Sequence, residues 1–247
     1  MGSGVKEDDN KTESGARSYW SESRRLSMGI LLLLPLAAIY QVGIVESGSE
    51  VRNLAELWLT QFISAAGVPA AHLVNGLLIG TIVMALFKLD RDGSVCGWFL
   101  VIMAMEGILY AAGMFRGLNL AATTAHHYLT EVLTVGDLGR TSVLVAVGAG
   151  VYEEIVFRLL LLGGGAALLH YVFQWNRAAC MCLMLLVSSG LFSLAHYVGM
   201  FGESPSMFTF LFRGLAGLVL GTIYILRGVG IAAWTHAGYN VMVLLAG

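Results

Sequence analysis

Apolar residues along the chain occur mostly in long runs separated by short polar segments. A helix needs about 20 predominantly apolar residues to cross the hydrocarbon core of a bilayer. Runs of this length predict seven transmembrane helices, at 26–45, 69–87, 95–115, 141–162, 178–200, 207–226 and 229–246.

The polar segments between these runs predict further features. Residues 1–25 form a tail rich in Gly, Ser and charge, which buries too little apolar area to fold and is predicted to be disordered. Residues 52–66 interleave apolar and polar positions as an amphipathic helix on the membrane surface does. We expect three consecutive glycines, 163–165, to end the fourth span with a flexible break.

Composition agrees with a membrane location. Of the 247 residues, 57% are hydrophobic and 12% are charged, where soluble domains carry about 25% charge. The mean hydropathy is +0.76, which excludes an ordinary soluble domain. A formal net charge of −2 argues against a nucleic-acid partner. We therefore predict an all-α, polytopic transmembrane bundle of about seven spans.

The distribution of basic residues predicts its orientation. With the N-terminus in the cytoplasm, most Lys and Arg side chains fall in inside segments, as the positive-inside rule requires. The inside residues are Lys6, Lys11, Arg17, Arg24, Arg25, Lys88, Arg91, Arg177 and Arg227, and the outside ones are Arg52, Arg116 and Arg140. An odd number of spans then places the C-terminus outside.

Three of the predicted spans carry polar residues that are costly inside a bilayer, where an ionisable side chain costs about 2.5–3.5 kcal/mol on insertion scales. The three groups are Glu153, Glu154 and Arg158 in the fourth span, Phe192 and His196 in the fifth, and His236 and Asn240 in the seventh. Glu154 and Arg158 have the favoured i,i+4 order for an ion pair. Glu153 lies about 100° around the helix and lacks that partner. These residues are either structural, as a buried ion pair and satisfied core histidines, or they line a functional cavity. Their concentration on three spans favours the cavity.

The motifs E-E-x-x-x-R, F-x-x-x-H and H-x-x-x-N, in this order on successive spans, resemble those of the CAAX-protease and bacteriocin-processing (CPBP) family of intramembrane glutamic endopeptidases. The resemblance runs from Thr141 to Gly247. Leu159 stands where the family often has Gly. The resemblance implies one membrane domain, in which residues 26–140 supply the N-terminal and interfacial helices and residues 141–247 supply the catalytic helices.

The resemblance also implies roles. Glu153 would be the general base on water, which His196 would hold, and His236 and Asn240 would donate to the oxyanion. Glu154, Arg158 and Phe192 would support them. The substrate would be a membrane-anchored protein or peptide in the bilayer, and a prokaryotic cell membrane is the expected location.

Several alternatives stay open from sequence. We expect no metal, because the chain has no H-E-x-x-H helix, yet two carboxylates and two histidines make a zinc-dependent protease the alternative. A non-proteolytic immunity or scaffold protein of the same fold is another. A proton-coupled transporter is disfavoured, since the chain shows neither internal repeats nor paired broken helices.

Two geometric questions also stay open. Straight helices would place Glu153 roughly 18 Å, His236 roughly 15 Å and His196 only about 6 Å below the outer ends of their spans. A tilted helix or a longer fifth span would reduce this mismatch. Glu106 stands alone in the third span, facing the cavity or pairing with Arg213.

Overall fold

The computed structural model describes residues 19–47, 53–65, 67, 97–124, 140–198 and 204–246. Every regular element in these ranges is a helix. Six of the helices there are long and apolar enough to cross a membrane: Leu26–Glu46, Gly97–Ala122, Val143–Phe173, Arg177–Ala195, Met207–Arg227 and Val229–Ala246. The prediction of an all-α membrane bundle is confirmed. The predicted span at 69–87 lies outside the described residues.

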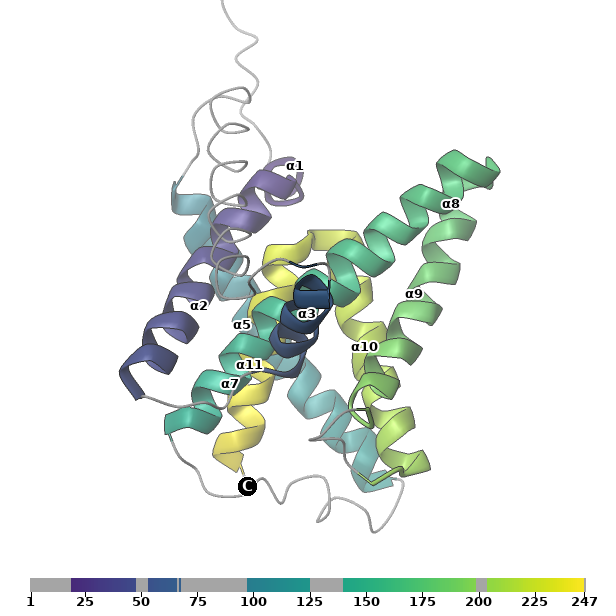
Figure 1. Cartoon of the computed structure of the whole chain (residues 1–247). Coiled ribbons are helices and arrows are strands. Elements are labelled where there is room, and N and C mark those ends of the chain that lie inside the picture. Colours follow the sequence, from purple (N-terminus) through teal and green to yellow (C-terminus); the bar gives the residue numbers. More distant parts are fainter. Residues whose placement is uncertain are drawn as a thin grey trace, which may run out of the picture.

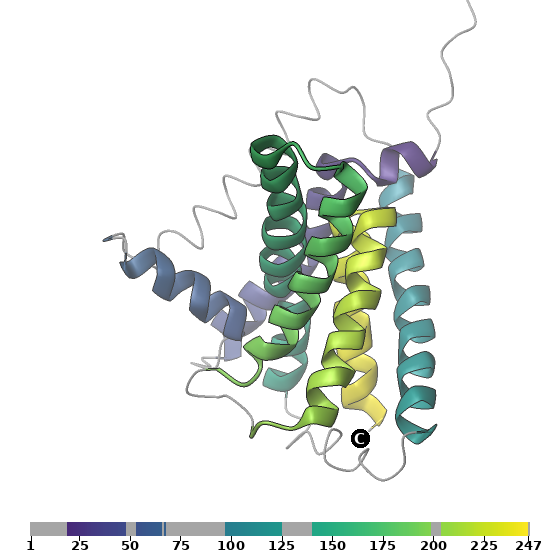
Figure 2. The same cartoon turned by 90° about the vertical axis from the view of Figure 1, so that its right-hand side faces the viewer.

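The helices in chain order are α1 (Tyr19–Ser23), α2 (Leu26–Ser47), α3 (Leu54–Ala65), α5 (Gly97–Thr124), α7 (Arg140–Glu153), the π-helix η1 (Glu154–Gly164), α8 (Gly165–Phe173), α9 (Arg177–Ala195), α10 (Met207–Arg227) and α11 (Val229–Ala246). Helix α11 packs against α2, α5, α7 and α10 and so forms the centre of the bundle. Helix α1 and the C-terminus lie at opposite ends (Figure 1). Helix α3 leads sideways away from the other helices (Figure 2).

Helices α7, η1 and α8 form one unbroken helix that crosses the bundle obliquely (Figure 1). Its apolar part spans 31 residues, more than the roughly 20 that a perpendicular crossing needs. The predicted break at the three glycines is therefore wrong. A Cβ on Gly163 would lie 2.2 Å from the Tyr224 hydroxyl, so this glycine admits a side chain of α10 instead of ending the helix.

Helix α9 ends at Ala195, whereas the fifth span was predicted to reach residue 200. His196 caps the helix, and its backbone N–H bonds to the carbonyl of Ser193. The mismatch in depth is thus not removed by a longer fifth span. Of the two explanations, the structure shows the tilt, because the α7–η1–α8 helix runs obliquely to its neighbours (Figure 1).

An ion pair ties α5 to the end of α10. The Arg227 guanidinium donates to both carboxylate oxygens of Glu106, Nε to Oε1 at 2.6 Å and Nη2 to Oε2 at 2.7 Å. The Tyr19 hydroxyl donates to the same carboxylate, and Trp20 stacks on Arg227 at 3.9 Å. Both sequence-based suggestions for Glu106 are therefore wrong. Tyr19 also belongs to helix α1, so the last part of the predicted disordered tail is helical.

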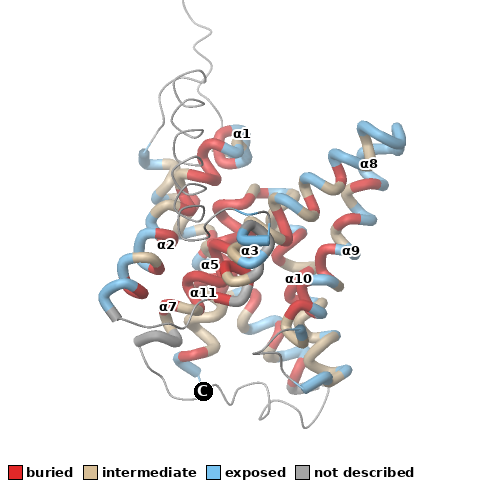
Figure 3. The backbone as a smooth tube through the Cα atoms, viewed as in Figure 1, coloured by how far each residue is buried: buried red, intermediate tan, exposed pale blue. Residues whose placement is uncertain are grey.

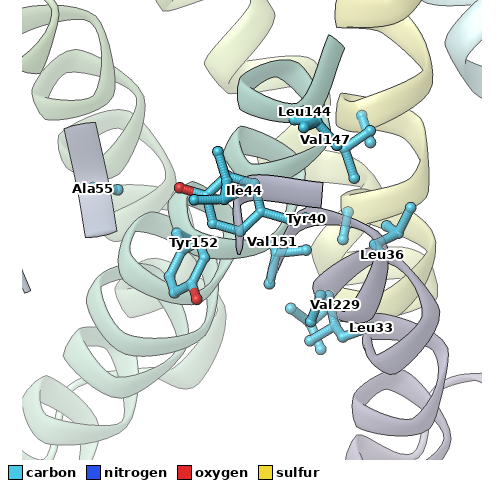
Figure 4. Packing of buried hydrophobic residues seen from close by; sticks show 13 residues of the cluster. Leu33, Leu36, Tyr40, Ile44, Ala55, Leu144, Val147, Val151, Tyr152 and Val229 are labelled. Atoms are coloured by element: carbon cyan, nitrogen blue, oxygen red, sulfur yellow. The ribbon is translucent and has the colours of Figure 1, made fainter. Parts of the chain in front are cut away.

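The largest cluster of buried apolar residues joins α2, α7 and α11. Tyr40 of α2 lies beside Tyr152 of α7 in this cluster, with ring centroids 5.5 Å apart (Figure 4). Buried positions follow the inner faces of α7 and α11, while α8 and much of α9 are exposed (Figure 3). Large apolar side chains such as Leu186 and Leu160 are more than half exposed, as lipid-facing residues of a membrane bundle are.

The α7–α11 contact depends on a glycine one turn before the acidic pair. A Cβ on Gly150 would lie 2.7 Å from the Ala237 Cβ and 2.8 Å from both the Ala237 N and the Ala233 carbonyl oxygen. Two of these atoms are backbone and cannot rotate away. Small residues at such crossings allow helix backbones to touch in membranes, and here this contact brings α11 against the residues that precede Glu153.

We predict that Gly150→Ala destabilises the protein, because the added methyl group must push α11 away from α7. Overpacking of this kind costs about 1–3 kcal/mol. Gly214→Ala is the matched control, since a Cβ there meets nothing within 4 Å. Thermal unfolding in detergent would measure both. Equal melting temperatures for the two variants would contradict a close α7–α11 contact.

Candidate active site

A fully buried ion pair forms the inner wall of the site. The Arg158 Nη1 lies 3.0 Å from Glu154 Oε1, and neither side chain is exposed to solvent. This confirms the i,i+4 pairing expected from sequence, although the residues lie in a π-helix. Arg158 Nη2 also donates to the carbonyl of Gly217 at 3.4 Å. The pair therefore joins the fourth span to α10.

His236 of α11 lies between the two glutamates. Its Nδ1 is 2.9 Å from Glu154 Oε1, and its Nε2 is 3.9 Å from Glu153 Oε2. A carboxylate paired with arginine can only accept a hydrogen bond, so Nδ1 carries the proton of this bond. The Nε2 atom is thereby directed toward Glu153.

The charges of this cluster require one more proton. With both glutamates ionised and Arg158 charged, the three side chains together would carry one net negative charge while at most 8% exposed. A buried net charge is costly. A proton on His236 or on Glu153 makes the cluster neutral, and these two groups adjoin one another. The site therefore places a titratable pair, Glu153 and His236, beside a fixed ion pair.

His196 is oriented by the backbone of its own helix. Its Nδ1 lies 2.9 Å from the carbonyl oxygen of Phe192, and a carbonyl only accepts, so Nδ1 carries a proton. In the neutral ring Nε2 then has a free lone pair.

Phe192 is the packing centre of the site. Its ring centroid lies 5.1 Å from that of His196 and 5.8 Å from that of His236. The Arg158 guanidinium lies 4.4 Å above the same ring, in the geometry of a cation–π contact. One aromatic side chain therefore fixes the two histidines and the arginine relative to one another.

Asn240 is placed differently from the other motif residues. Its amide Nδ2 donates to the carbonyl of Ala146 at 3.5 Å, the upper limit of a hydrogen bond. It lies one helical turn beyond His236 on α11. Among the described residues, the site thus brings Glu153, Glu154, Arg158, Phe192, His196 and His236 together, and Asn240 is directed at the backbone of α7.

Sequence reasoning missed Asn53 and Glu56 at the start of α3 and Tyr40 of α2, which contacts both. Asn53 donates from Nδ2 to Glu153 Oε1 at 3.1 Å, and both residues are buried. Arg158 pairs with Glu154, as expected, and Glu153 takes its hydrogen bond from a separate segment of the chain. The Tyr40 hydroxyl accepts from the Asn53 N–H at 3.0 Å and donates to Glu56. Asn-x-x-Glu before an apolar run is a helix-capping signature, and this signal marked Asn53 and Glu56 in the sequence.

The site also contains side chains of the types that bind zinc. Glu153, His196 and His236 are the residues of zinc-binding type, while Glu154 is engaged by Arg158. Within the described part of the chain, no three His, Cys, Asp or Glu side chains are grouped to hold an ion. A zinc centre usually has three protein ligands at about 2.0–2.3 Å, and zinc stays the alternative that chelation tests.

The fold and the site together define an integral membrane protein with a carboxylate–histidine centre buried among its helices. Residues 139–242 match the family model described as type II CAAX prenyl endopeptidase Rce1-like. The matched segment contains all three motifs, and the match confirms the resemblance drawn from them. The match supports a CAAX protease-type enzyme. No curated protein and no solved structure is detectably similar to the chain.

We predict that Arg158→Ala lowers stability as well as activity, because it leaves Glu154 buried without its cation. Breaking a buried pair in this way costs roughly 3–5 kcal/mol. The double variant Glu154→Gln with Arg158→Met should recover most of the melting temperature in detergent, since Gln still accepts from His236 Nδ1. Cleavage should not recover. A stable Arg158→Ala protein would contradict the burial of a charged pair.

Proposed function

We propose that the protein is an intramembrane endopeptidase of the glutamic type, in which Glu153 activates water to hydrolyse a peptide bond of a membrane-associated substrate. The observation that supports this most directly is the setting of Glu153. It is buried inside the bundle, accepts a hydrogen bond from Asn53 and lies beside His236 Nε2, while Glu154 takes up Arg158. A carboxylate that is not paired with an arginine is suited to accept a proton.

The proposed hydrolysis uses these positions in two steps. Glu153 removes a proton from water as the water oxygen attacks the scissile carbonyl carbon. The C–N bond then breaks, and the same proton passes from Glu153 to the leaving amine. His196, whose Nε2 has a free lone pair when its Nδ1 bonds to Phe192, accepts a hydrogen bond from the attacking water and holds it in place.

The developing oxyanion needs hydrogen-bond donors. In the protonated state His236 offers Nε2–H, because its Nδ1–H is committed to Glu154. Asn240 supplies the second donor in this proposal. Its hydrogen bond to Ala146 is long, at 3.5 Å, so the amide exchanges a weak partner for the substrate oxygen.

The family match and the position of the site among spanning helices support a membrane-anchored peptide as the substrate. A peptide anchored in the membrane, such as a prenylated C-terminus of the kind in the family's description, meets a site enclosed by spanning helices. The charge asymmetry of the loops supports an N-terminus in the cytoplasm and a C-terminus outside. The proposed location is a prokaryotic cell membrane.

Two other functions are alternatives that the experiments below test. A non-proteolytic immunity or scaffold protein would need the buried pair for folding but not the proton-accepting Glu153. A zinc-dependent protease would use Glu153 and the histidines as ligands.

We predict that Glu153→Gln abolishes cleavage with little loss of folded protein. Glutamine keeps the volume and an oxygen that accepts from Asn53, but it cannot take a proton from water. Membrane fractions of cells that express wild-type or Glu153→Gln protein would be compared by N-terminal peptide proteomics, alongside melting temperatures in detergent. Identical cut sites in the two samples would sink the proposed mechanism, and a large stability loss would favour a structural role.

A chelator provides the control for zinc. The purified wild-type enzyme should keep its activity after dialysis against a strong chelator, because no proposed step uses a metal. Loss of activity that Zn²⁺ alone restores would transfer the assignment to a metalloprotease.

A further inference from the structure

Asn53 lies far from the family-matched segment in sequence and adjoins the proposed base in space. It is 3% exposed and comes directly before α3. Its amide donates from Nδ2 to Glu153 Oε1 at 3.1 Å. The match to the protease family begins only at residue 139, so this contact comes from a part of the chain that carries no motif of the family.

The orientation of the Asn53 amide is fixed by a second hydrogen bond. Its Oδ1 accepts from the backbone N–H of Ala55 at 2.9 Å, which caps the first turn of α3. Because the oxygen is committed to the helix end, the NH₂ group is the end that faces Glu153. An amide turned the other way would lose both bonds and place oxygen against a carboxylate.

The cap itself is held by α2. The Tyr40 hydroxyl accepts from the Asn53 N–H at 3.0 Å and donates to Glu56, the last residue of the Asn-x-x-Glu capping sequence. In a simple capping box the acidic side chain bonds to the first N–H directly. Here Tyr40, which is fully buried, stands between the two groups and fixes the start of α3 to the bundle.

We propose that Asn53 is a positioning residue for the general base: its amide holds the ionised carboxylate of Glu153 in the orientation that accepts the proton of water. This inference rests on the proposed function. A hydrogen bond from a donor favours the ionised form of a carboxylate and restricts its rotation. The catalytic site therefore depends on α3 as well as on the three family motifs.

The variants separate the two tasks of Asn53. Asn53→Ser and Asn53→Asp both keep an oxygen that caps α3, because Ser, Asp and Asn are comparable N-caps. An ionised Asp has no donor for Glu153, and the Ser hydroxyl is one bond shorter than the amide and does not reach the position of Nδ2. Asn176 offers a matched control. It caps α9 in the same way, with Oδ1 accepting from Ala178 N at 2.9 Å, and is exposed.

The experiment measures kcat and KM on a membrane-anchored reporter that carries a cut site found in the wild-type proteome, with the enzyme in proteoliposomes. Asn53→Ser should lower kcat roughly tenfold or more, as loss of one charge-assisted hydrogen bond does, with KM within about twofold. Asn176→Ser should match the wild type. A wild-type kcat for Asn53→Ser would overturn the proposal.

The pH profile gives a readout that a purely structural role would not move. Asn53→Asp places a second carboxylate beside Glu153, so the acidic limb of activity should move to higher pH. The other charged groups around Glu153 are unchanged in every variant: Glu154 and Arg158 on its own helix, His236 on α11 and His196 after α9. Asn176→Asp should leave the limb in place, and an unmoved limb in Asn53→Asp would count against Asn53.

Failure of the proposed function can be distinguished from failure of the Asn53–Glu153 contact. If wild-type protein cuts nothing, the endopeptidase assignment fails, and the contact is decided by melting temperatures of Asn53→Ser, Glu153→Leu and the double variant. A loss in the double variant smaller than the sum of the single losses would support the contact. Additive losses would overturn it.

Discussion

Two adjacent carboxylates lie inside a membrane bundle, and the rest of the site follows from the need to satisfy them. Glu154 is fully buried, so it takes Arg158 as its counter-ion one turn along the helix and His236 from α11. Glu153 cannot use the same cation, because Arg158 is already engaged. It is left with a neutral donor, Asn53, and with an imidazole that can gain or lose a proton. A fixed pair beside a titratable pair is an arrangement suited to acid–base chemistry.

Packing makes this arrangement possible. Gly150 allows α11 to touch the backbone of α7, which brings His236 within hydrogen-bond distance of Glu154. Phe192 fills the space between the histidines and Arg158. Since protein interiors are close-packed and transmit strain, a small displacement of either helix would alter the distances between His236 and the two glutamates. The geometry of the site therefore depends directly on the contacts between these helices.

The N-terminal part of the chain contributes more than anchoring. The Tyr40, Asn53 and Glu56 side chains join α2, the start of α3 and the acidic pair in one hydrogen-bonded group. Helix α3 also leads away from the bundle (Figure 2). A segment that contacts the proposed base at one end and extends outward at the other couples its own placement to the orientation of Glu153.

The sequence by itself determined the helical membrane class, the Glu154–Arg158 pair and the three motifs, because each depends on local features: apolar runs of spanning length, an i,i+4 spacing, and residue types too costly to bury by chance. The tertiary structure alone decided the partners that come from distant segments. Glu106 pairs with Arg227 rather than with Arg213, and Glu153 contacts Asn53, 100 residues away. It also decided that Gly163 continues a helix instead of breaking it, because Tyr224 of α10 fills the space that a side chain would occupy. Such contacts are set by how the helices cross, and helix crossing is not encoded in any one segment of the chain.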